Sequence, residues 1–84
     1  MIPIHELLNR IRWDKEFGRG EFHIGYYDRL EARLIRVPLC DVVFEPGDHF
    51  SFVLTDHQGV RHSIPLHRIK EVYKDGALIW YREH

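Results

Sequence analysis

The sequence contains a single cysteine, Cys40, among its 84 residues. It therefore cannot form an intramolecular disulfide or a zinc site built from several cysteines. Cys40 follows Pro38 and Leu39 with no histidine beside it, so we expect a small buried side chain rather than a reactive thiol. No apolar run approaches the roughly 18 residues of a membrane span, and no signal-peptide pattern is present. We therefore expect a cytoplasmic protein that does not cross a membrane.

An excess of basic residues is also missing, because 12 lysines and arginines face 13 aspartates and glutamates. Proteins that bind duplex nucleic acid by bulk electrostatics normally carry a clear basic excess, so this class is excluded. Lysine itself is scarce, and nine of the 12 basic residues are arginine. The planar fork of arginine donors matches phosphate or carboxylate. The bias fits either a compact anion site or ordinary surface ion pairs between arginine and carboxylate.

Metal and nucleotide-hydrolysis motifs are absent from the sequence. There are seven histidines, but no His-x-His or His-x-x-His pair. His57, His62 and His67 recur at a spacing of five, which suits neither a helix face nor a strand face. No glycine-rich phosphate loop precedes a helix. We therefore expect no metal, no cofactor and no P-loop chemistry.

The apolar residues that are present predict one helix followed by short strands. Ile4, Leu7, Leu8 and Ile11 recur at helical spacing, which predicts a helix that ends near Trp13. Alternating patterns and turn residues then predict strands over residues 22–29, 33–37, 42–44, 50–55 and 60–64, before a final hairpin. We expect one α+β domain over residues 1–84, with the N-terminal helix packed on a curved antiparallel sheet of about six short strands. A sheet this small can curl into a partly closed barrel.

The final hairpin has the clearest turn signal, which is the pair Asp75-Gly76. A two-residue loop at this point places Tyr73 opposite Leu78. A regular ladder would then place Val72 opposite Ile79 and Glu71 opposite Trp80.

Polar and aromatic residues gather in four places, at residues 9–14, 26–29, 61–69 and 80–82. Arginines beside aromatic rings on a sheet suit single-stranded nucleic acid, because bases stack on the rings and guanidinium groups take phosphate. Taken alone, however, Trp13, Tyr26 and Trp80 are each more typical of a hydrophobic core.

His67-Arg68 is the pair that fits a core least well. A histidine can donate to a phosphate oxygen or act as acid and base near neutral pH, and the alternative is a surface histidine without a task. Asp28 has two interpretations of equal weight. It forms a local salt bridge with Arg29, or it orients a neighbouring arginine or histidine in a phosphate pocket.

Several strings occur in an order that resembles a known family. They are Leu-Asn-Arg-Ile-Arg-Trp-Asp at residues 8–14, Gly-Tyr-Tyr-Asp-Arg at 25–29, Ile-Pro-Leu-His-Arg-Ile at 64–69, and Gly76 with Ile79-Trp80. Together they resemble the small archaeal-type domain proposed to recognise RNA cyclic-phosphate ends in RNA repair. The resemblance covers nearly the whole chain. It implies an RNA-binding module for RNA termini, either 2′,3′-cyclic phosphate or 3′-phosphate.

The resemblance and the chemistry of the residues together predict which side chains bind RNA. The expected binding residues are Asn9, Arg12, Trp13, Tyr27, Asp28, Arg29, His67 and Arg68. In this hypothesis Arg12, Arg29 and Arg68 hold phosphates, His67 donates to the terminal phosphate, and Tyr27 or Trp13 stacks on a base. The expected partners are RNA 3′ ends. Because the family also occurs fused to RNA-processing modules, a further expected partner is an RNA-processing enzyme acting in trans.

Two alternatives to RNA-end recognition stay open. The first is a small metal-independent RNA cyclic phosphodiesterase or ribonuclease that uses His67, together with His62, as acid and base. The second is a protein-interaction module whose aromatic residues dock a partner chain. We assign no catalytic residue, and a binding module is favoured over an enzyme.

Overall fold

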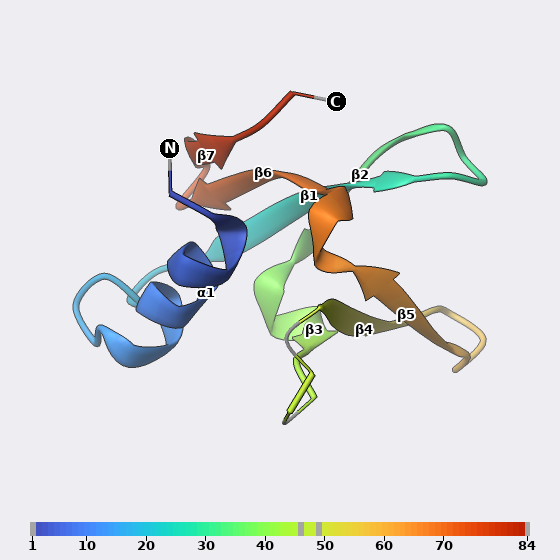
Figure 1. Cartoon of the computed structure of the whole chain (residues 1–84), viewed down its shortest axis with the longest axis horizontal. Helices are drawn as coiled ribbons and strands as arrows, with labels where there is room; N and C mark the ends of the chain where they lie inside the picture. Colours follow the sequence, from blue (N-terminus) through green and yellow to red (C-terminus); the bar gives the residue numbers. More distant parts are fainter. Residues whose placement is uncertain (1, 46, 49, 84) are drawn as a thin grey trace.

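The computed structural model describes residues 2–45, 47–48 and 50–83. These ranges contain one helix, seven strands and two short 3-10 helices (Figure 1). In chain order they are α1 (Ile4–Trp13), β1 (Phe22–Asp28), β2 (Arg33–Pro38), η1 (Leu39–Asp41), β3 (Val42–Val43), β4 (Ser51–Thr55), β5 (Arg61–Pro65), η2 (Leu66–Arg68), β6 (Ile69–Lys74) and β7 (Ala77–Tyr81).

The strands form two antiparallel sheets. One has four strands in the order β2-β1-β6-β7, and the other has three in the order β3-β4-β5. Figure 1 shows α1 at the left of the view, below β6 and β7, with the smaller sheet at the lower right. The α+β prediction is confirmed. In the described part of the chain the two sheets do not close into a barrel.

Two corners of the same local pattern carry the chain between the sheets. Each reads apolar-Pro-Leu-x-x-apolar, at residues 37–42 and 64–69. The prolines have φ of −63° and −60°, which a pyrrolidine ring prefers, and each is followed by one 3-10 turn. η1 leads from β2 to β3, and η2 leads from β5 back to β6.

The leucine of each corner packs inward and the two following residues face outward. Leu66 is buried and His67 is exposed, and in the other corner Cys40 is exposed. The prediction of a buried Cys40 is therefore wrong. An apolar sequence context did not decide its position, because a single 3-10 turn can bury its first residue while leaving the next outside.

The core lies between the helix and the two sheets. Phe52, Ile24, Ile69 and Val72 are fully buried at its centre. The helix contributes Ile4 and Leu7, with Leu8 and Ile11 packed against the same cluster. The periodicity of the N-terminal segment therefore identified the helix and its buried face correctly.

The two tryptophans have opposite environments. Trp80 is buried, and its Nε1 donates a hydrogen bond of 2.8 Å to the carbonyl of Ile2. Trp13, in contrast, is 76% exposed at the end of α1, so a core position for it is wrong. Trp13 follows Ile11 by two residues, which places it about 200° around the helix from that inward side chain. Tyr26, the third aromatic residue in that expectation, is buried as expected.

The final hairpin contains a bulge that the sequence did not predict. Tyr73 pairs with Leu78 as expected, but Val72 pairs with Trp80 and Glu71 with Tyr81. Ile79 is the extra residue of β7, so the regular ladder predicted beyond Tyr73 is wrong. The bulge aligns Trp80 with fully buried Val72, which places the indole in the core.

We predict that Phe52→Ala lowers the free energy of unfolding by about 3–5 kcal/mol, because it opens a cavity at the centre of the core. The ring is fully buried and contacts Tyr26 and Phe44 with centroid separations of 5.8 and 6.4 Å. Phe50→Ala is the matched control, since Phe50 is 83% exposed two residues earlier. Urea denaturation measures both changes, and equal losses would contradict this description of the core.

Candidate functional site

Two adjoining hollows share the side chains of Tyr27, Arg29 and Arg68. The first, of about 290 Å³, extends to Asp28, Asp56 and His62, and the second, of about 560 Å³, extends to His67 and Lys70. We call this pair of hollows the arginine groove. Its walls come from the β1–β2 loop, the β4–β5 hairpin and η2. In Figure 1 both loops lie at the right of the view, on the side away from α1.

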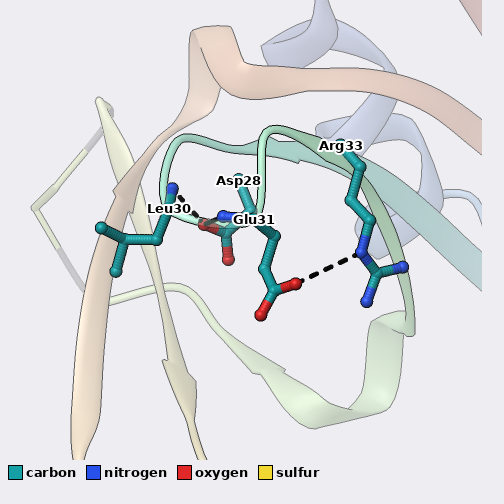
Figure 2. A network of polar contacts seen from close by, with 4 residues as sticks. All are labelled: Asp28, Leu30, Glu31 and Arg33. Carbon is teal, nitrogen blue, oxygen red and sulfur yellow. Dashed lines mark hydrogen bonds and ion pairs between the residues drawn. The ribbon is translucent and has the colours of Figure 1, made fainter.

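The loop that carries Arg29 is held by Asp28, the last residue of β1. Its Oδ1 accepts hydrogen bonds from the backbone N–H of Leu30 at 2.8 Å and of Glu31 at 3.2 Å. Figure 2 shows this carboxylate beneath its own loop. It also shows the hydrogen bond that Nε of Arg33 donates to Oε2 of Glu31, at 3.5 Å. Among the described residues Asp28 forms no ion pair with Arg29. Asp28 therefore orders the loop on which Arg29 stands, as aspartate commonly does in turns.

The turn that carries His67 and Arg68 is held from outside by Arg82. Nε of Arg82 donates to the carbonyl of Ile69 and Nη2 to that of Leu66, each at 2.8 Å. The backbone N–H of Arg82 also donates to the carbonyl of Lys70 at 2.9 Å. Burial lowers the pKa of Arg82 from its usual value, and the carbonyls of Ile69 and Leu66 accept from its guanidinium. Arg82 thus ties the C-terminal segment to η2 and to the first residues of β6.

Lys70 reaches the groove through a second bulge. Gly25 of β1 pairs with Glu71 and Tyr26 pairs with Ile69, which leaves Lys70 as the extra residue of β6. Bulges of this kind redirect a side chain, and Lys70 lines the second hollow beside His67. The sequence showed no signal for this position, because the bulge depends on the pairing of two distant strands.

The nine arginines serve different purposes, and two stand out. Arg10, Arg33 and Arg61 pair with carboxylates at the surface. Within the described ranges, the side chains of Arg29 and Arg68 have neither a hydrogen bond nor an ion pair, and both line the arginine groove. Arg68 is half-buried, and Arg29 is exposed. Surface ion pairing therefore accounts for part of the arginine bias, and Arg29 and Arg68 remain candidates for an anion site.

An aspartate–histidine pair forms one wall of the groove. Nε2 of His62 lies 2.8 Å from Oδ2 of Asp56. The other oxygen of Asp56 accepts the backbone N–H groups of Gln58 and Val60, each at 2.9 Å. Hydrogen bonds from His62 and the hairpin backbone lower the pKa of Asp56 below its usual value, so it is ionised near neutral pH. Asp56 was not among the expected site residues, because its sequence context indicated only a turn.

The remaining expected residues lie elsewhere. Asn9 and Arg12, on α1, line a separate hollow of about 340 Å³ together with Phe44 and Leu66. The guanidinium of Arg12 lies 5.7 Å from the Phe44 ring centroid. Leu66 precedes His67, so η2 contributes residues to this hollow and to the arginine groove. Trp13 lines neither.

The described ranges contain neither a candidate metal site nor a membrane-spanning helix. They contain no group of three or more histidine, cysteine, aspartate or glutamate side chains arranged to hold a metal ion. None of their helices has the length and hydropathy needed to span a bilayer.

A family model describes almost the whole chain. It is the MJ1316 RNA cyclic group end recognition domain, and it matches residues 1–82. The chain belongs to this family. The resemblance drawn from the short strings is thereby confirmed, and the family's name supports an RNA-end-binding role. No curated protein and no solved structure matches the chain with significance.

We predict that Arg82→Lys lowers the free energy of unfolding by about 1–3 kcal/mol, because lysine keeps the charge but cannot reach two carbonyls with a planar fork. Arg19→Lys is the control, since Arg19 is exposed and lines neither hollow. Urea denaturation measures stability, and hydrogen exchange at Ile69 reports on the turn. A variant as stable as the parent, with unchanged exchange, would show that Arg82 does not hold η2.

Proposed function

We propose that the arginine groove binds the 3′ end of an RNA strand that terminates in a 2′,3′-cyclic phosphate or a 3′-phosphate. The observation that carries the proposal is the presence of Arg29 and Arg68, without partners in the described ranges, in one groove. A guanidinium that no carboxylate neutralises can offer its paired donors to phosphate oxygens. Family membership supplies the ligand class.

The neighbours of the two arginines suit the rest of a terminal nucleotide. Tyr27 lines both hollows, which puts an aromatic ring within reach of the terminal base for stacking. His67 and Lys70 line the second hollow and supply further donors for the phosphate. These positions favour Tyr27 over Trp13 as the stacking residue, since Trp13 lines none of the three hollows described above.

The charge of the chain favours an end over a long tract. With a net charge of −1, the protein has little general attraction for a polyanion. A compact site with two or three cationic side chains does not need this general attraction, because it contacts the rigid group of oxygens of a terminal phosphate directly. In this proposal the strand continues past η2, and Arg12 and Asn9 in the separate hollow contact the preceding phosphate.

The cellular setting is part of the proposal. An RNA-end reader without a catalytic centre of its own would act in RNA repair or processing, together with an enzyme supplied in trans. The cytoplasm is the compartment we propose for it.

We predict that Arg68→Ala weakens binding to cyclic-phosphate RNA by about 10- to 100-fold, because it removes a charge-assisted pair of hydrogen bonds. The ligand is one short single-stranded RNA, prepared with a 2′,3′-cyclic phosphate, a 3′-phosphate or a 3′-hydroxyl end. Binding is measured by titration at two salt concentrations, and each RNA is then examined on a gel. Arg19→Ala is the control, since it removes the same charge outside the groove.

Each result has a definite meaning. Tighter binding to a phosphate-bearing end, lost in Arg68→Ala but kept in Arg19→Ala, supports end recognition. Equal losses in both variants, or equal binding to all three ends, would refute it. Opening of the cyclic phosphate during the titration would instead show the phosphodiesterase alternative.

A further inference from the structure

The Asp56–His62 pair lines the arginine groove, and the phosphate contacts proposed above do not include it. His62 lies in β5, two residues before Ile64, so the two side chains lie on the same face of the strand. Ile64 is buried in the core, whereas His62 is exposed and lines the first hollow with Arg29 and Arg68. The imidazole therefore faces the space that we assign to the terminal phosphate.

Asp56 determines which nitrogen of the ring is available. A carboxylate only accepts hydrogen bonds, so Nε2 of His62 must carry the hydrogen directed at Oδ2. Both oxygens of Asp56 are occupied, by His62 and by the hairpin backbone, which holds the ring in one orientation. Nδ1 has no partner among the described residues. It is therefore the atom that a ligand in the groove can meet.

Nδ1 offers different hydrogen bonding in the two charge states. In the neutral ring it is an acceptor, and in the protonated ring it is a donor. A 2′,3′-diol end carries hydroxyl donors, whereas a 2′,3′-cyclic phosphate carries only acceptors at the same place. A protonated ring therefore favours the cyclic end, and a neutral ring can accept from a diol.

We propose that His62, oriented by Asp56, contacts the RNA terminus through Nδ1 and helps to distinguish a cyclic phosphate from a 2′,3′-diol. The proposal rests on RNA-end binding in the arginine groove. It adds a contact that neither the family match nor the sequence strings assign, and it makes the choice of end depend on pH.

The groups around His62 leave few other sources of such a dependence. Those facing it across the first hollow are Tyr26, Tyr27 and Asp28 from β1, Arg29 from the following loop, Arg68 from η2 and Asp56 from its own hairpin. Ordinary aspartates titrate well below pH 5, and tyrosines and arginines well above pH 8. Burial raises the pKa of Tyr26 further, with a smaller contribution from the charge of Asp28. Among the described residues that line the arginine groove, the other histidine is His67, in the adjoining hollow.

The test compares the affinities of one short RNA with a cyclic-phosphate end and with a 2′,3′-diol end, at constant ionic strength. The cyclic phosphate is a diester whose charge does not change over this range, so any change in preference comes from the protein. We expect the preference of the parent protein for the cyclic end to rise about ten-fold between about pH 8 and about pH 5.5. In His62→Gln this rise should be clearly smaller than in the parent.

Two matched variants identify the histidine responsible. His57→Gln alters the same hairpin outside the arginine groove, and His67→Gln alters the other histidine of the groove. His57→Gln should keep the full pH dependence of the parent. His67→Gln removes a proposed phosphate donor, so binding should weaken, but a rise in preference toward low pH should remain. Because His62 is exposed, its substitution does not threaten the core.

A parent protein that prefers the cyclic end equally at both pH values would overturn the role of His62 while leaving RNA-end recognition intact. An undiminished rise in His62→Gln, or the complete loss of the rise in His67→Gln, would also overturn it. A parent protein that binds neither RNA at either pH would refute both this inference and the proposed function.

Discussion

The candidate site depends on the hydrogen bonds by which Arg82 holds η2, the turn between the two sheets. A single 3-10 turn followed by a bulged strand leaves carbonyl groups that regular pairing would otherwise occupy. Arg82 donates to three of them, at Leu66, Ile69 and Lys70. The same short segment presents His67, Arg68 and Lys70 to the arginine groove. A residue near the end of the chain therefore positions the side chains that we expect to meet RNA, without lining that groove itself.

In the other walls of the groove, an aspartate accepts hydrogen bonds from the backbone instead of pairing with an arginine. Asp28 binds the N–H groups of its own loop, so its charge is directed to the backbone rather than to Arg29. Asp56 likewise holds the β4–β5 hairpin and the ring of His62. These hydrogen bonds occupy carboxylate oxygens that would otherwise be available to the guanidinium groups of Arg29 and Arg68. A nearly neutral chain can in this way keep a locally cationic site.

The sequence was informative wherever local patterns decide the structure. Helical spacing from Ile4 to Ile11 predicted α1, and alternation at residues 22–29 predicted a strand that the structure has as β1. The structure shows that Phe22, Ile24 and Tyr26 are its buried residues. The specific strings identified the family that the model match confirms. Local patterns failed at Cys40 and Trp13, where apolar character suggested burial. A side chain in a corner or at a helix end can be apolar and exposed, since its direction depends on the backbone there.

What the sequence by itself determined is the α+β class, most element boundaries, the turn at Asp75-Gly76 and the family. Tertiary structure alone decided the two sheets, the bulges at Lys70 and Ile79, and the division of the expected residues between the arginine groove and a separate hollow. It also brought Asp56, His62 and Arg68 together with Arg29, which lies far from them along the chain. The physical reason is range: propensity and periodicity act over a few residues. Register, bulges and grooves instead arise where strands distant in sequence must share one core and satisfy each other's backbone groups.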